Sequence, residues 1–190
     1  MDVGYWKKMN LPNKITMIRF LMIPLFILVI SLWHNAAGDF VAFLLFAGAA
    51  CTDFIDGHIA RSRNLITDFG KFMDPLADKV LVAAALIALV AMDRVPAWVV
   101  IIILAREFAI TGLRTIVVEH GTVVAASPLG KIKTTLQMLA ICFLLIYTLP
   151  ILPHQVFFVI GQVLMYLALL FTIISGVDYM VKCKEVFLDC

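Results

Sequence analysis

Charged residues are scarce in this chain. Only 15% of its 190 residues are Asp, Glu, Lys or Arg, whereas 63% are hydrophobic, and the mean hydropathy is +1.04. A soluble domain usually carries about a quarter charged residues, so this chain lacks the polar surface needed to remain in water. We therefore expect one integral membrane domain over residues 1–190, with no nucleic-acid partner. A soluble helical bundle is the disfavoured alternative.

Paired cysteines and a cleavable leader are also missing. The cysteines at positions 51, 142, 183 and 190 form no CxxC pair and lie in or beside apolar runs, so we expect buried free thiols. The N-terminal segment has basic residues, but the apolar run that follows is too long for a signal peptide and has no small-residue cleavage site. We expect this segment to be retained.

Long apolar runs dominate what is present. A helix that crosses a bilayer needs about 20 mainly apolar residues, and six stretches meet that length. They cover residues 15–33, 40–60, 69–92, 96–118, 129–149 and 155–180. The fold class predicted is therefore an all-α integral membrane protein with six transmembrane helices. Ahead of them, Trp6, Lys7 and the segment NLPNK predict an amphipathic juxtamembrane segment on the inner leaflet.

The basic residues predict the topology. They cluster at both ends of the chain and around the second and fourth connections, whereas the first, third and fifth connections contain only Arg94. By the positive-inside rule, both termini and the even-numbered connections face the cytoplasm. Spans two and three therefore meet at a cytoplasmic turn, within reach of a soluble substrate.

The stretch CTDFIDGHIARSRNLITDFGKFMDPLADKV gathers carboxylates between two spans. Asp53 and Asp56 are three residues apart and share one helix face, while Asp74 and Asp78 are four apart on the next span. Small residues interleave with them, at positions Gly57, Ala60 and Gly70. If the two helices are antiparallel neighbours, the carboxylates can converge on one pocket. The stretch leaves open whether Pro75 kinks the second helix or marks its start.

Converging carboxylates repel one another unless some are protonated or a multivalent cation lies among them. Oxygen ligands without His or Cys suit Mg²⁺ or Mn²⁺ and not zinc. The alternative is a set of separate carboxylates, solvated at the interface or paired with Arg61, Lys71 and Lys79. The spacing with interleaved small residues favours the metal site.

The same residues resemble a known signature. The pattern D-x2-D-G-x2-A-R-x8-G-x3-D-x3-D is typical of the CDP-alcohol phosphotransferase family, and this chain fills every position, with Asp53, Asp56, Gly57, Ala60, Arg61, Gly70, Asp74 and Asp78. The stretches NLPNKITMIRFLMIP, AREFAITGLR and LGKIKTTLQM are similar to the bacterial members that make phosphatidylglycerophosphate. The resemblance covers essentially the whole chain.

The resemblance implies a reaction and its cofactors. The phosphatidyl group of CDP-diacylglycerol would pass to sn-glycerol 3-phosphate, giving phosphatidylglycerophosphate and CMP. Two divalent ions, Mg²⁺ or Mn²⁺, would be held by Asp53, Asp56, Asp74 and Asp78, and Asp78 would also be the general base. The donor lipid would be bound by Gly57, Ala60, Arg61 and Gly70. The resemblance also implies a homodimer in the bacterial cytoplasmic membrane, with the active site facing the cytoplasm.

Cations on spans four and five predict an acceptor site. Arg106 lies too deep in its span to reach the interface, so it needs a partner, which Glu107, Asp53 or a bound phosphate can supply. Family resemblance assigns the acceptor phosphate to Arg106, Arg114, Lys131, Lys133 and Thr134, with either lysine or both in contact. The alternative is that these cations only obey the positive-inside rule or bind lipid headgroups.

Other functions remain in competition. The same chemistry with another acceptor would define a cardiolipin synthase or a phosphatidylinositol-phosphate synthase. A cation or proton transporter is a distant alternative, because transporters often contain repeated halves and no internal repeat is visible here.

Overall fold

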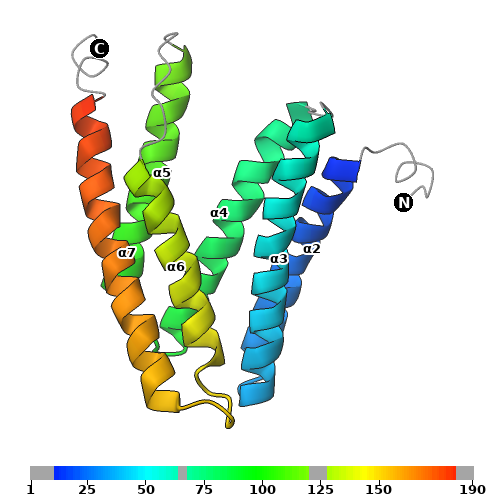
Figure 1. Ribbon diagram of the computed structural model, residues 1–190, viewed down its shortest axis with the longest axis vertical. Helices are drawn as coiled ribbons and strands as arrows, with labels where there is room; N and C mark the ends of the chain where they lie inside the picture. Colours follow the sequence, from blue (N-terminus) through cyan, green and yellow to red (C-terminus); the bar gives the residue numbers. More distant parts are fainter. Residues whose placement is uncertain (1–10, 64–67, 120–127, 183–190) are drawn as a thin grey trace. The chain divides into compact units, whose positions relative to one another are not determined.

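The computed structural model describes residues 11–63, 68–119 and 128–182. Within these ranges the chain forms six α-helices and no strand (Figure 1). The helices are α2 (Leu11–Leu32), α3 (Ala36–Arg63), α4 (Asp68–Ala91), α5 (Ala97–Glu119), α6 (Pro128–Ile146) and α7 (His154–Lys182). The all-helical fold predicted from the apolar runs is therefore confirmed.

The helix bounds follow the predicted spans to within a few residues. The main difference lies at the second connection, because α3 continues to Arg63 and α4 already begins at Asp68. Pro75 consequently falls inside α4 and does not mark its start. Residues 64–67 of this connection are outside the described ranges, as is most of the N-terminal segment for which we predicted an amphipathic role.

The described residues group into two compact units, which are considered separately. The first unit comprises Met1–Ala88 together with Thr148–Leu152. Its core lies where α2 packs against α3 (Figure 1). The rings of Phe26 and Phe46 lie with centroids 6.4 Å apart, and both side chains are fully buried. Ala42 and Ala49 on α3 are also buried, which allows the two helices to approach closely.

The start of α3 is capped by its own sequence. The Asn35 side-chain oxygen accepts a hydrogen bond from the backbone N–H of Gly38 at 2.8 Å, as expected of an N-cap residue. Asp39 in the first turn complements the positive end of the helix dipole. Its buried carboxylate accepts a hydrogen bond from the Thr148 hydroxyl at 2.7 Å, which ties the connection after α6 to this helix.

The second unit comprises Leu89–Tyr147 together with Pro153–Cys190. In it α6 and α7 pack along each other and α5 packs against α7 (Figure 1). The α6–α7 contact is close at Gly161, where an added Cβ would lie 2.7 Å from Cγ of Leu144. Glycine is therefore required at this crossing.

The turn between α4 and α5 is built around one left-handed residue. Asp93 has φ of 54°, and the N–H groups of Asp93 and Arg94 donate to the carbonyls of Val90 and Leu89. This is the Schellman arrangement that satisfies the last carbonyls of a helix. Arg94 is buried, donates to the Leu144 carbonyl at 2.9 Å and stacks over Tyr147.

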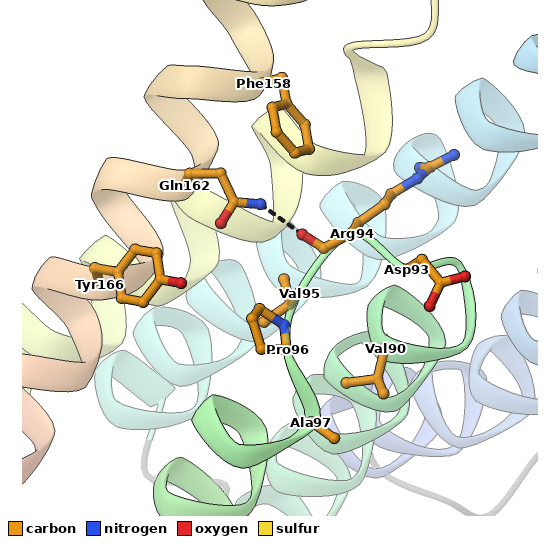
Figure 2. A pocket seen from close by; sticks show the side chains of 9 residues that line it. All are labelled: Val90, Asp93, Arg94, Val95, Pro96, Ala97, Phe158, Gln162 and Tyr166. Atoms are coloured by element: carbon orange, nitrogen blue, oxygen red, sulfur yellow. Dashed lines mark hydrogen bonds between the residues drawn. The ribbon is translucent and has the colours of Figure 1, made fainter.

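A cavity of about 580 Å³ opens beside this turn (Figure 2). Its wall includes Gln162 of α7, whose amide donates to the Arg94 carbonyl at 2.5 Å, together with Tyr166 and Phe158. Ala97, also in the wall, lies nine residues before Arg106 on α5, or about 14 Å along the helix axis. The cavity is thus separate from the predicted acceptor site.

Within the described part of the chain, two helices are long and apolar enough to cross a membrane, over Leu129–Ile146 and His154–Val181. Shorter apolar stretches occupy Met17–Leu32 and Ala36–Thr52. Many large apolar side chains point outward, such as Ile101 at 64% exposure and Val181 at 66%, as expected of surfaces that face lipid.

The cysteine prediction was partly wrong. Cys51 and Cys142 form no disulfide among the described residues, as predicted, but Cys51 is exposed and Cys142 only half-buried. An apolar segment of a membrane protein can place a thiol on its lipid-facing surface, so an apolar neighbourhood in the sequence does not imply burial. Cys183 and Cys190 lie outside the described residues.

Candidate functional site

The predicted metal and donor residues lie on two helices. Asp53, Asp56, Gly57, Ala60 and Arg61 fall within α3, and Gly70, Asp74 and Asp78 fall within α4. Both stretches are helical, which is the condition under which residues three or four apart share a helix face.

Only Asp78 among the four carboxylates has a described side chain, and it is half-buried. The side chains of the other predicted metal and donor residues lie outside the described part of the structure. Among the side chains that are described, no group of three metal-ligating residues occurs. The donor set itself, four carboxylates on two helical faces, fits a hard divalent cation.

The side chain of Arg106, a residue of α5, contacts one residue of its own helix and one residue of α7. Its Nη2 donates to the Ser175 hydroxyl at 2.9 Å, and its Nη1 lies 3.4 Å from Oε1 of Glu107. Of the three partners predicted for this intramembrane arginine, Glu107 is therefore confirmed. The side chain is 17% exposed, and its buried Nε forms no hydrogen bond within the described residues. These contacts use two of the five N–H donors of the guanidinium, so the side chain keeps capacity for an anion at its Nη groups.

Lys133 joins the same cluster from α6. Its ammonium group pairs with Oε1 of Glu107, the oxygen that also faces Arg106, and its side chain is only 3% exposed. One carboxylate thus holds two cations contributed by two helices. We refer to Arg106, Glu107, Lys133 and Ser175 as the α5–α7 polar cluster. Its formal charge is positive, which suits a multiply charged anion.

The remaining predicted acceptor residues are placed differently. Arg114, Lys131 and Thr134 are exposed, and the Thr134 hydroxyl donates to the Gly130 carbonyl of its own helix at 3.0 Å. Lys131 and Thr134 have no described contact within the polar cluster, whereas the like charge of Arg114 is close enough to act on Arg106. Burial thus distinguishes Lys133 from Lys131, a choice that their spacing in the sequence left open.

Gly176 makes room for Arg106. A Cβ added at Gly176 would lie 3.2 Å from Cγ of Arg106 and 3.7 Å from its Nε. The first distance is tighter than most Cβ contacts, whereas the second is ordinary van der Waals contact, so a larger residue would press on Cγ of Arg106. Gly176 therefore lets α7 approach Arg106 closely enough for the neighbouring Ser175 to bind it.

The sequence did not single out Ser175 and Gly176, which border Arg106, or Gln137, which is a buried amide of α6. The first two lie on α7, which carries none of the recognised motifs, and small residues are common in membrane helices. Gln137 lies within the quoted stretch LGKIKTTLQM, but nothing in its spacing singled it out. For both Ser175 and Gln137, the signal available in the sequence was a polar residue within an apolar run.

Comparison with known proteins identifies the family. Residues 9–174 match the model of the CDP-alcohol phosphatidyltransferase family, and the chain belongs to this family. Members generally depend on a divalent metal ion. The family and the two long apolar helices together indicate a membrane protein.

Individual relatives cover nearly the whole chain. A CDP-diacylglycerol–glycerol-3-phosphate 3-phosphatidyltransferase of Bacillus subtilis is 46% identical over 187 residues, covering 93% of this chain and 96% of the relative. A protein of the same name from Rickettsia felis is 38% identical, with 94% and 97% covered. A probable phosphatidylglycerophosphate synthase of Mycobacterium tuberculosis is 41% identical, with 91% and 81% covered.

Proposed function

We propose that this protein transfers the phosphatidyl group of CDP-diacylglycerol to sn-glycerol 3-phosphate, giving phosphatidylglycerophosphate and CMP. Family membership supports the transfer chemistry, and the names of the relatives support this donor and acceptor. The observation that carries the choice of a phosphorylated acceptor is the α5–α7 polar cluster. It presents two largely buried cations on a shared carboxylate.

The acceptor phosphate is a dianion and requires preorganised cations. Arg106 would supply N–H groups that its hydrogen bonds to Glu107 and Ser175 leave unused, and Lys133 would supply an ammonium group in a site that is almost closed to solvent. Electrostatic attraction is stronger in such a low-dielectric site than in water. Arg114, Lys131 and Thr134 lie further out and would guide the acceptor or hold it more weakly.

The donor site is proposed from the family pattern. Asp53, Asp56, Asp74 and Asp78 would hold two Mg²⁺ or Mn²⁺ ions, which when bound neutralise the diphosphate of the donor. Gly57, Ala60 and Gly70 would leave room for the cytidine, and Arg61 would contact the diphosphate. Catalysis of this kind depends mainly on positioning and on charge neutralisation.

The reaction also needs a group that accepts the proton of the attacking hydroxyl, and Asp78 is the proposed acceptor of that proton. The primary hydroxyl of glycerol 3-phosphate gives its proton to the Asp78 carboxylate, and its oxygen bonds to the phosphorus of the phosphatidyl group. The bond from that phosphorus to the bridging diphosphate oxygen breaks, and the bond electrons leave with CMP. A positioned base of this type contributes roughly 10²–10⁴-fold to the rate.

The same proposal includes the membrane topology and the oligomeric state of the protein. The chain would form one domain with six membrane spans in the bacterial cytoplasmic membrane, with both termini and the active site on the cytoplasmic side. It would act as a homodimer. The clustering of Lys and Arg at the chain ends and at the even connections supports this orientation.

An acceptor screen tests the function. Purified protein receives Mg²⁺, CDP-diacylglycerol and one acceptor at a time, namely glycerol 3-phosphate, phosphatidylglycerol, inositol phosphate or serine. We expect CMP release with glycerol 3-phosphate only. Equal turnover with phosphatidylglycerol would indicate a cardiolipin synthase, and equal turnover with inositol phosphate would indicate a phosphatidylinositol-phosphate synthase. Ion flux without CMP release would point to the transporter.

A further inference from the structure

Gln137 of α6 is a buried amide with unused hydrogen-bonding capacity. Its residue exposure is 2%, and neither Oε1 nor Nε2 forms a hydrogen bond with any residue that the structure describes. Buried polar side chains are normally hydrogen-bonded, because otherwise nothing replaces the water they lose. An amide in this position therefore indicates a ligand that is recognised by hydrogen bonds.

The position of Gln137 connects it to the polar cluster. It follows Lys133 by four residues, so the two side chains share one face of α6, about 6 Å apart along the helix axis. Beyond Gln137 the buried face of α6 continues with Ala140, Ile141 and Leu144. Gln137 is therefore the last polar residue on this buried face of α6.

We propose that Gln137 hydrogen-bonds the C2 hydroxyl of the acceptor and so selects glycerol 3-phosphate among phosphorylated alcohols. This inference rests on the proposed function. The acceptor has three kinds of polar group, and the proposed mechanism already uses two of them. Its phosphate binds the cations, and its primary hydroxyl attacks the donor. The C2 hydroxyl remains, and it both donates and accepts hydrogen bonds, as an amide does.

A purely structural role makes a different prediction. If Gln137 makes no contact with the acceptor, replacing it by an apolar residue of similar length should leave the stability of the protein unchanged or increase it. Such a replacement removes a buried amide that has no hydrogen bond to a described residue. Such a replacement would leave acceptor preference unchanged. If Gln137 reads the C2 hydroxyl, the same replacement reduces turnover of the acceptor that carries this hydroxyl and has little effect on an acceptor that lacks it.

The test compares glycerol 3-phosphate with 3-hydroxypropyl phosphate, which lacks the C2 hydroxyl. CMP release by the purified full chain gives kcat/KM for each acceptor, and their ratio measures the discrimination. We expect wild type to prefer glycerol 3-phosphate, and Gln137→Met to reduce the ratio by roughly 10-fold or more. Gln162→Met is the matched control, because Gln162 lies beside the α4–α5 turn and should leave the ratio as in wild type.

The possible results distinguish a failure of the inference about Gln137 from a failure of the proposed function. An unchanged ratio in folded Gln137→Met overturns the inference, and so does a wild type that does not distinguish the two acceptors. Should Gln137→Met not fold, Gln137→Asn is measured instead; its shorter amide should also lower the ratio, and an unchanged ratio overturns the inference. If wild type releases CMP with neither acceptor, the proposed function itself fails and the inference falls with it.

Discussion

Glu107 of α5 and Lys133 of α6 form an ion pair whose carboxylate oxygen also faces the guanidinium of Arg106. The lysine side chain is only 3% exposed, so water stabilises little of its charge. Glu107 thus stabilises the positive side chains of Arg106 and Lys133, which would otherwise repel each other.

Replacing Glu107 by Gln removes the charge that holds the two cations. Unpaired buried charges are strongly destabilising, so Arg106 and Lys133 should move apart or toward solvent. We expect KM for glycerol 3-phosphate to rise roughly 10-fold or more, with a smaller change in kcat. Steady-state CMP release measures both constants. Asp93→Asn is the control, because it neutralises an exposed carboxylate in a turn where Asn tolerates positive φ. A KM equal to that of wild type would contradict the role given to Glu107.

The two lysines near the start of α6 should differ in importance. Lys133 is buried and paired, whereas Lys131 is exposed. A charge in a nearly closed site interacts more strongly with a phosphate than one that is screened by water. We expect Lys133→Met to raise the acceptor KM by at least roughly 10-fold more than Lys131→Met does. Comparable effects would show that burial does not identify the phosphate-binding lysine.

Gly176 should influence catalysis without contacting substrate. In Gly176→Ala the new methyl group presses on Cγ of Arg106, which lies 3.2 Å from the Cβ position. Small displacements of a positioning group lower rates substantially, so we expect kcat/KM for glycerol 3-phosphate to fall by roughly 10-fold. The matched control is Gly112→Ala on α5, where no atom lies within 4 Å of the added Cβ. If both variants behave alike, close approach at Gly176 does not position Arg106.

Asp78 is the proposed general base. Asp78→Asn keeps the shape of the side chain but cannot accept the proton, so kcat should fall by roughly 10²–10⁴-fold. Binding of CDP-diacylglycerol, measured separately by equilibrium titration, should persist. Asp93→Asn again provides a charge-matched control outside the proposed site. A near-normal kcat in Asp78→Asn would rule out the base assignment.

Gly161 should affect stability and not chemistry. An added Cβ would lie 2.7 Å from Leu144, at the crossing of α6 and α7, and overpacking of this kind typically costs about 1–3 kcal/mol. We expect thermal unfolding in detergent to begin at a lower temperature for Gly161→Ala. Gly112→Ala should be neutral or slightly stabilising, because alanine favours the helix. An unshifted Tm for Gly161→Ala would show that the crossing can adjust.

Much of the architecture was predictable because it depends on local properties. The apolar runs predicted all six helices, since helix length and hydrophobicity are properties of a continuous segment. The spacing of Asp53 and Asp56, and of Asp74 and Asp78, predicted shared faces, and those stretches are helical. Whether the four side chains converge remains a prediction.

The acceptor cluster required the tertiary structure. Lys133 meets Glu107 across 26 residues, and Arg106 meets Ser175 across 69. Such contacts depend on how α5, α6 and α7 are rotated against one another, and side-chain packing along whole helices sets that rotation. The sequence by itself determined the family, the helices and the register of the acidic motif. Only the packed structure decided which lysine is buried, which α7 residues hold Arg106, and that the buried amide of Gln137 has no hydrogen bond to a described residue.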